Sequence, residues 1–355
     1  MSRLHLPFVA LVFSFSALAQ GQGVQIRANY RSLPPVAVPP DPNEPVTGVI
    51  QALAAPQDRS RALALMNRAR LGQQLHMRTM PPFVLQGHFT STSGKGILTE
   101  TWMGGQKWRW SGTVGDDFAI RIGGEGLHYG APQGGAIPPT VHVLRNAIFW
   151  AGGGVPDASA SLRSSAIIWN GKPATCLLFG SRGEQPEGAR TWEEEEYCID
   201  DATGQLQVHS FVPGTYVNYS YTAQFHGRTP ASGITIYSGN KKVLEAQLTM
   251  NDAGSPDDAL FIPTEQMQSY GPVGSGTMPS RMTIFSPSAS VSDAAKPVVI
   301  HASVDSQGAV VAEELSIAAD PALAQTALDL VKAKGFPPNA NIREIYVEVR
   351  FVAEQ

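Results

Sequence analysis

Hydrophobic and polar residues alternate along many short stretches of this chain, which is the pattern of β-strands that bury one face. Between Phe83 and about residue 263, runs such as FVLQGHFTS, AIIWN, QLQVHSFV and KKVLEAQLTM are separated by connections rich in Gly, Pro, Asn and Asp. The clearest hairpin is GILTETWMGGQKWRWSG, where Gly104 and Gly105 separate two strands. So many strands predict one large antiparallel sheet curved into an open barrel, because a flat sheet would leave long exposed edges.

A helix is predicted before this sheet, at about residues 57–72. There Ala62, Leu65, Met66 and Ala69 recur at helical spacing, and most of the arginines fall on the other face. An arginine-rich helix face can lie in solvent or on a membrane surface. We favour the first interpretation, in which the helix packs on the sheet and its arginines face solvent. The stretch TVHVLRNAIFW is a candidate for a second helix.

The last part of the chain has a different order of elements: strand, strand, helix, strand. PVVIHASVD and AVVAEELSI flank a turn at Ser306–Gly308, and a helix from Pro321 to Lys334 ends at Gly335. The closing strand places Ile345, Val347, Val349 and Phe351 on one face and Tyr346, Glu348 and Arg350 on the other. We expect one edge of this small sheet to be unpaired, or else covered by the preceding linker or the barrel.

Length and composition indicate a mainly β chain with two domains, because 355 residues exceed the roughly 250 that one core usually serves. Gly 35 and Pro 27 fit many short strands joined by tight turns. The predicted organisation is a signal peptide (1–19), a Pro-rich linker (20–48), a β-rich domain (49–267), a Gly/Pro/Ser-rich linker (268–293) and an α+β domain (294–355).

The start of the chain predicts export. MSRLHLPFVALVFSFSALAQ combines Arg3, an apolar run and the A-x-A pattern at Ala17–Ala19. We expect a cleaved secretory signal, since the run is shorter than the roughly 20 residues of a membrane helix, and an uncleaved anchor is the alternative.

Export in turn favours a disulfide between Cys176 and Cys198, which lie in two strand-like runs separated by a polar, turn-rich stretch. Two buried free thiols are the alternative. Closing that loop would stabilise the fold by about 3 kcal/mol.

Residues 294–355 resemble the TonB C-terminal domain, through the turn Asp305–Gly308, the helix in DPALAQTALDLVKAKGF, the F-x-P at Phe336–Pro338 and the final strand. That resemblance implies a periplasmic α+β domain that docks a partner, such as a segment of an outer-membrane receptor, by strand addition. The candidate docking positions are Tyr346, Glu348 and Arg350.

More weakly, residues 57–263 resemble the LolA and LolB lipoprotein carriers, through the leading helix, FVLQGHFTS, GILTETWMGGQKWRW and YTAQFHGRTP followed by GITIYSGNKKVLEAQLTM. This resemblance implies an open barrel with a helical lid that holds an acyl chain. The candidate apolar pocket residues are Trp102, Trp108, Trp110 and Tyr219, for which packing in the core is the alternative.

Catalytic and metal-binding patterns are missing from the sequence: it has no G-x-S-x-G, H-E-x-x-H or phosphate loop, and its histidines are scattered. We interpret WEEEEYC as a solvated hairpin tip and place His301 on an exposed strand face. A net charge of -4 without a basic stripe argues against nucleic acid. We therefore expect no enzyme, metal or cofactor. The main hypothesis is a periplasmic interaction protein, and the alternative is a carrier of lipid or lipoprotein.

Overall fold

The computed structural model describes residues 49–77, 79–104, 107–124, 127–130, 138–149, 161–180, 190–239, 241–272, 280–288, 297–318, 321–339 and 343–353. All of them belong to one compact unit, Pro35–Gln355. The predicted signal peptide and the Pro-rich linker at 20–48 lie outside the described residues.

One large sheet contains fourteen strands, and every neighbouring pair in it is antiparallel. In spatial order the strands are β1 (Gln51–Ala52), β7 (Ser161–Trp169), β8 (Lys172–Gly180), β9 (Glu195–Asp200), β10 (Leu206–Val212), β11 (Thr215–Ser220), β12 (Gly233–Ser238), β13 (Lys241–Asp252), β2 (Phe83–Ser91), β3 (Gly94–Trp102), β4 (Trp108–Val114), β5 (Asp117–Gly124), β6 (Leu127–Gly130) and β14 (Gln268–Pro272). The mainly β prediction is confirmed. The sheet is not closed into a barrel, because β1 and β14 are the two ends of the order and do not pair with each other.

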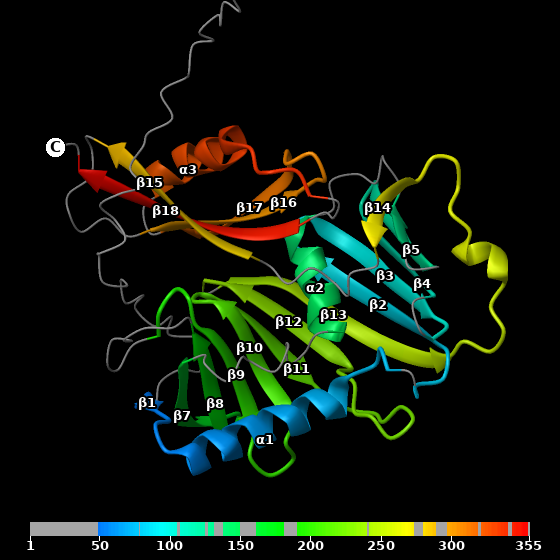
Figure 1. The fold of residues 1–355 in the computed structure, drawn as a ribbon, viewed down its shortest axis with the longest axis horizontal. Helices are drawn as coiled ribbons and strands as arrows, with labels where there is room; N and C mark the ends of the chain where they lie inside the picture. The colour runs from blue at the N-terminus through cyan, green and yellow to red at the C-terminus, as the bar shows by residue number, and fades with distance from the viewer. Residues whose placement is uncertain are drawn as a thin grey trace, which may run out of the picture. The chain divides into compact units, whose positions relative to one another are not determined.

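Two helices pack against the large sheet: α1 (Pro56–Gln73) and α2 (Pro139–Phe149) (Figure 1). Met66 and Ala69 of α1, with Val141 and Leu144 of α2, join one buried core with the sheet. The apolar spacing of both helices accounts for this, since residues three or four apart share a helix face. A short 3-10 helix, η2 (Asp258–Phe261), follows β13.

A second sheet has four strands in the order β15 (Ser280–Ser288), β18 (Arg343–Ala353), β16 (Val298–Val304) and β17 (Val310–Ala318). Helix α3 (Pro321–Lys334) covers one face and buries Leu323, Ala327 and Val331 there (Figure 1). They recur every four residues, so they share one face of the helix. Gly308, at φ +90°, lies where an added Cβ would collide with the backbone of Phe336, so this turn requires glycine.

The closing strand is not at an edge of the sheet, so the predicted docking strand is wrong. β18 pairs with β16 on one side and, in parallel, with β15 on the other. β15 occupies part of the stretch that the composition marks as linker 268–293, and β14 occupies another part. The reason is that Met282 and Ile284 alternate onto the apolar core of the four-stranded sheet, a short signal hidden between Pro- and Ser-rich flanks.

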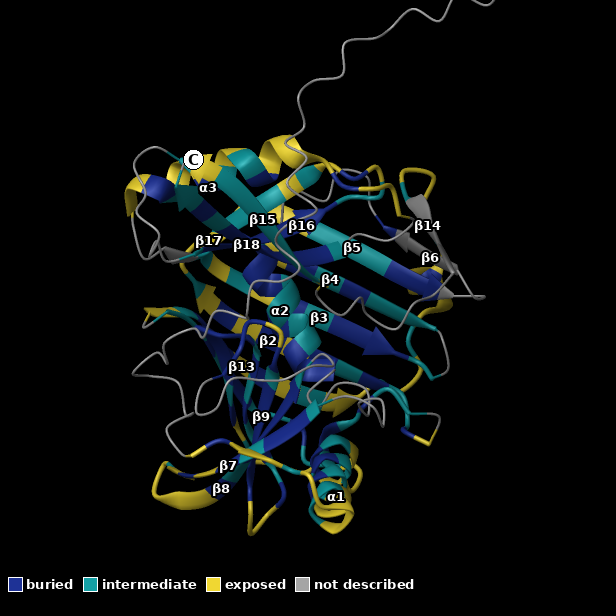
Figure 2. Ribbon diagram, turned by 60° about the vertical axis from the view of Figure 1, so that its left-hand side comes forward, coloured by how far each residue is buried: buried dark blue, intermediate teal, exposed yellow. Residues whose placement is uncertain are grey.

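The two central strands of this sheet, β16 and β18, are buried on both faces, whereas the edge strands β15 and β17 are half-buried or exposed. Figure 2 shows this difference for β15. The second face carries His301, Tyr346 and Glu348, all at most 3% exposed, which corrects the exposed position predicted for His301. On that face Val299 and Tyr346 pack with Trp192 and Val212 of the large-sheet region. Alternation correctly separates the two faces, but it does not show that a second layer covers the polar one.

Candidate functional site

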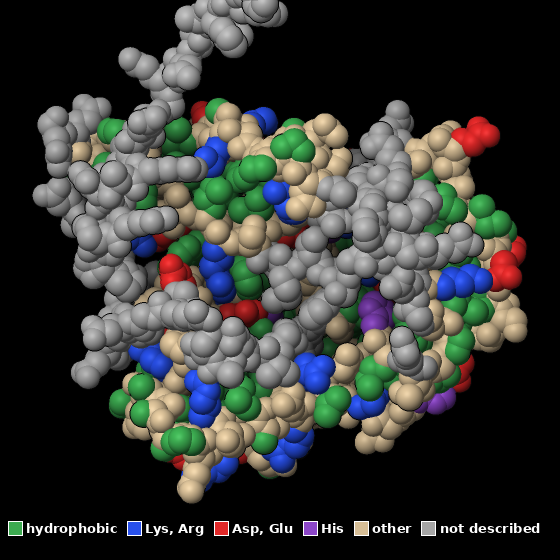
Figure 3. All heavy atoms as spheres, viewed as in Figure 1, with side chains coloured by type: hydrophobic (Ala, Val, Ile, Leu, Met, Phe, Trp, Pro, Cys, Tyr) green, Lys and Arg blue, Asp and Glu red, His purple; other side chains and the backbone are tan. Residues whose placement is uncertain are grey.

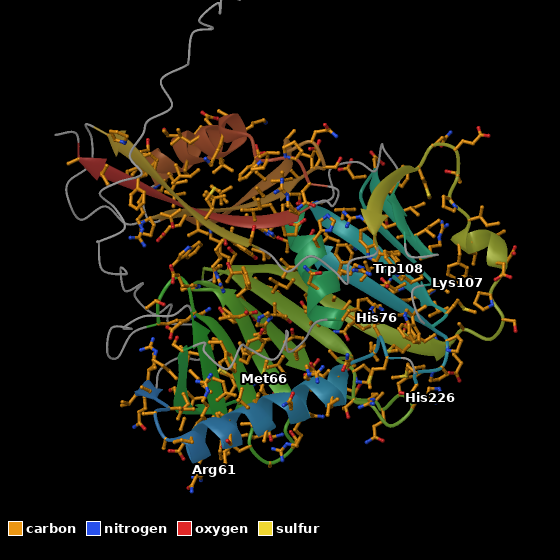
Figure 4. The ribbon with its side chains drawn as sticks, in the orientation of Figure 1. Arg61, Met66, His76, Lys107, Trp108 and His226 are labelled. Carbon is orange, nitrogen blue, oxygen red and sulfur yellow. A yellow bond between two sulfur atoms is a disulfide. The ribbon has the colours of Figure 1, made fainter. Side chains whose placement is uncertain are left out.

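The candidate site is an aromatic surface on the large sheet, where helix α2 packs. Phe83 and Trp102 stack with centroids 5.4 Å apart, and His76 stacks on Phe149 of α2 at 4.3 Å. Figure 4 labels His76 and Trp108, two members of this group. We call this set the aromatic face: Phe83, Trp102, Trp108, Trp110, His76 and Phe149.

A buried ion pair lies inside the aromatic face. Arg145 of α2 donates two hydrogen bonds to Glu100 of β3, at 2.9 and 3.0 Å, and its guanidinium lies over the rings of Trp108 and Trp110. Burial raises the pKa of Glu100, but Arg145 and then His76 outweigh it and hold the pKa below its ordinary value. Glu100 is therefore ionised at neutral pH. A charged pair at the centre of this surface binds α2 in one register.

Two further polar contacts attach α2 to the four-stranded sheet. Glu314 of β17 accepts hydrogen bonds from the backbone N–H (3.0 Å) and the hydroxyl of Thr140, in the first turn of α2. A carboxylate there offsets the unpaired N–H groups and the positive end of the helix dipole. Two residues later, His142 Nε2 lies 3.9 Å from Glu344 Oε1.

His142 lies in a largely buried polar cluster. Burial lowers the pKa of His142 from 6.5 to about 4, against the opposing effect of Glu344. Glu344 also contacts His301 (3.0 Å) and accepts hydrogen bonds from the Ser303 hydroxyl (3.0 and 3.1 Å). Burial raises the pKa of Glu344, and these neighbours together bring it below its ordinary value. The helix is thus held by neutral and charged polar groups as well as by apolar packing.

The four predicted pocket residues lie in two places. Trp102 and Trp110 are buried in the core, and Trp108 is half-buried beside Arg145. Tyr219 stacks on Tyr221, whose hydroxyl accepts a hydrogen bond from Gln73 of α1. Three of the four therefore gather on the aromatic face, and Tyr219 lies apart from them. Neither of the two cavities found among the described residues is lined by these four side chains.

The prediction that the glutamate run WEEEEYC forms a solvated hairpin tip is wrong. Glu194 and Glu196 are fully buried: Arg163 donates to Glu194 at 2.7 Å, and Arg190 donates to Glu196 at 3.2 Å. Glu195 receives contacts from Tyr197 (2.6 Å) and His209 (2.8 Å). Burial raises the pKa of Glu195, and His209 more than offsets this. The arginines lie elsewhere in the sequence, so the run alone looked solvated.

Cys176 and Cys198 face each other on β8 and β9 and are joined by a disulfide. Glu196 lies close to both sulfurs, but disulfide sulfurs are not metal ligands, so this grouping is no metal site. Among the described residues no other cluster of potential ligands is found.

Arg350 and Glu348, two of the predicted docking residues, pair with each other at 2.9 Å, and the Thr283 hydroxyl of β15 donates to Glu348 at 3.0 Å. These contacts turn both side chains toward partners within the sheet, and Glu348 Oε1 is left buried without a hydrogen-bond partner among the described residues.

Sequence reasoning missed Glu100, His76, Arg145 and Glu314. One signal for Glu100 was available: in GILTETW it falls between Leu98 and Trp102 on the inward face, and a carboxylate there needs a buried partner. Nothing in the sequence indicated that the partner was Arg145.

None of the helices among the described residues is long and apolar enough to span a membrane. Basic and acidic side chains are interspersed on the face drawn in Figure 3. The fold places the chain in the class of proteins with a large open antiparallel sheet that helices pack against. A smaller four-stranded sheet with one helix follows it.

Comparison with protein-family models gives no match, and neither does comparison with curated proteins. Among solved structures, similarity is found to a LolA superfamily protein from Nitrosomonas europaea (8% identity, 57% of this chain and 97% of that one, TM-score 0.38). A DUF1329 family protein from Desulfovibrio piger gives 9% identity, 57% and 96% coverage, and a TM-score of 0.34.

The Pseudomonas aeruginosa MucA/MucB complex gives 12% identity over 59% of this chain and 62% of that chain, with a TM-score of 0.24. Structural neighbours thus include LolA superfamily and DUF1329 proteins, and a TonB C-terminal domain is not among those reported. Because every TM-score is below 0.5, these similarities carry no argument about what this chain does.

Proposed function

We propose that this chain is a non-catalytic periplasmic carrier that binds an apolar chain, such as the acyl chain of a lipid or lipoprotein, on the aromatic face. The observation that carries this proposal is that one short helix, α2, covers an aromatic sheet surface and is attached there through polar side chains. In the ligand-free state α2 fills the groove, and the ligand takes its place.

The energies permit such an exchange. Moving α2 away exposes Leu144, Ile148 and Phe149, each worth roughly 1.5–3 kcal/mol of burial. An acyl chain of a dozen methylenes would return on the order of 10 kcal/mol at about 0.8 kcal/mol per CH₂. The polar groups of α2 regain water on opening. Glu100 stays on the sheet, so the bound ligand must leave this carboxylate in contact with water, because burying it unpaired would cost about 3–5 kcal/mol.

The test has two parts. Protein purified from the periplasm is extracted with organic solvent for mass spectrometry, and the delipidated protein is titrated with a fluorescent fatty acid. We expect stoichiometric lipid or saturable binding. Trp110→Ala should weaken binding, whereas Ile168→Ala, on an exposed residue of β7, should not. Because Trp110→Ala also removes core packing, unfolding curves of both variants are measured alongside.

Finding no lipid and no saturable binding with folded protein would contradict the carrier proposal. That result would favour the other hypothesis, a protein that binds an envelope partner.

A further inference from the structure

A cavity of about 240 Å³ lies between the large sheet and the four-stranded sheet, apart from the aromatic face. It is smaller than the roughly 300 Å³ at which drug-sized pockets begin. Its wall is rich in hydroxyl groups, and the lining residues that matter here are Thr215, Ser238, Glu314, Ser316, His301 and Tyr346.

The hydroxyl groups of the wall form a connected set. Thr215 Oγ1 and Ser316 Oγ are 2.7 Å apart, and the Ser238 hydroxyl donates to the Ser316 carbonyl at 2.5 Å. Each hydroxyl can both donate and accept, so the set can adapt to a bound polar group.

Glu314 and Tyr346 each keep one polar atom without a partner among the described residues. Both hydrogen bonds from Thr140 go to Glu314 Oε2, which leaves Oε1 unbonded there. Tyr346 is 1% exposed and its ring stacks on His301 with centroids 4.2 Å apart, yet its hydroxyl bonds to no described residue. The ring is buried but the hydroxyl reaches the cavity, where a bound polar group can form a hydrogen bond with it.

We infer that this cavity binds a small, uncharged polyhydroxylated molecule of about monosaccharide size. Glu314 Oε1 only accepts, so the ligand must donate an O–H to it, while the Tyr346 hydroxyl and the Ser–Thr set bond to further hydroxyls. The lining contains a carboxylate and no Lys or Arg, which disfavours an anion. The first turn of α2 already offsets the charge of Glu314, which favours a neutral ligand over a cation.

The test is saturation-transfer NMR on the purified protein with D-glucose, N-acetylglucosamine and glycerol, and with glucosamine and glucuronate as charged comparisons. We expect saturable binding of at least one neutral compound. Tyr346→Phe keeps the ring but removes the hydroxyl, and should weaken that binding about 3- to 10-fold. The matched control is Tyr237→Phe, since Tyr237 stacks on Tyr216 and does not line the cavity.

Glu314→Gln tests the same binding a second time, because it replaces the carboxylate acceptor by an amide of the same shape. It should also weaken binding of the neutral compound. Three results would each overturn the inference. They are a folded protein that binds no neutral compound at 50 mM, a protein that prefers glucuronate or glucosamine, and an equal affinity of Tyr346→Phe and the parent chain. Both proposals involve α2, since Thr140 and Val143 line this cavity, but they use different ligands and different variants, so each test can fail while the other succeeds.

Discussion

At the scale of single residues, the buried pair of Glu100 and Arg145 should be expensive to break. Arg145→Met removes the charge that compensates Glu100, and an unpaired buried carboxylate typically costs about 3–5 kcal/mol. We expect a loss of that size in the free energy of unfolding, measured with urea. The double variant Glu100→Gln with Arg145→Met should recover more than half of it.

Arg61→Met serves as the control, since Arg61 is exposed and should change stability by no more than about 0.5 kcal/mol. Equal losses in Arg145→Met and in the double variant would contradict the view that the unpaired carboxylate carries the cost.

His142 should make the stability of the fold depend on pH. Its pKa is about 4 in the folded chain and 6.5 ordinarily, so between these values the unfolded chain binds more protons. This contribution is present above pH 6.5 and is lost as the pH falls toward 4. Glu344 and His301 on the small sheet, Arg121 on β5 and Arg145 on α2 surround the ring.

From pH 7 to pH 4.5 we expect a loss of about 2 kcal/mol attributable to His142. Urea unfolding of the parent chain and of His142→Gln, at both pH values, isolates the contribution of His142. The variant should lack this part of the change in unfolding free energy with pH. Parallel pH profiles for the two proteins would refute the assignment.

Much of the residue pattern was predictable from sequence, and the failures have a common physical cause. Alternation assigned Val347 and Val349 to the core and Tyr346 and Glu348 to the other face, correctly in both cases. It could not show that the other face is also buried, because that depends on a second sheet. The same holds for Glu194 and Glu196, whose arginine partners are visible only in three dimensions.

At the scale of elements, β15 should hold the parallel edge of the small sheet in place. Ile284 packs against the core of that sheet while remaining half-buried, so Ile284→Ala should destabilise by about 1–2 kcal/mol, less than a fully buried site. Amide hydrogen exchange across β18 should rise, since β15 covers one of its edges. The matched control is Val311→Ala on β17, an exposed position at the opposite edge; if it matches Ile284→Ala, β15 has no special role.

The hairpin of β8 and β9 depends on its covalent link. The disulfide closes a separation of 22 residues, and the chain-entropy relation gives about 3 kcal/mol for such a loop. Cys176→Ala with Cys198→Ala should lower the free energy of unfolding by about that amount. Reductant should destabilise the parent chain similarly and leave the double variant unchanged. A parent chain indifferent to reductant, with both thiols alkylated without it, would show that the link is not made in the protein.

At the scale of the whole molecule, the buried contact between the sheets should make them unfold together. Val299 and Tyr346 pack with Trp192 and Val212, and Arg281 of β15 donates to the carbonyl of Phe211. All six tryptophans precede residue 193. In a Trp192→Phe background, which removes the tryptophan that packs in the contact itself, the fluorescence of the others follows the large-sheet region, whereas hydrogen exchange of residues 297–353 follows the small sheet. In that background both probes should give one transition, as cooperative unfolding requires.

Val299→Asp should separate the two transitions. The change places an unpaired carboxylate in the buried contact, which penalises the packed arrangement while leaving the α3 side of the small sheet untouched. We therefore expect the hydrogen-exchange midpoint of residues 297–353 to fall below the fluorescence midpoint in urea, with each region still folding. Val311→Asp, at an exposed position of the same sheet, should keep the midpoints together. Coincident midpoints in Val299→Asp would mean that the contact does not couple the sheets.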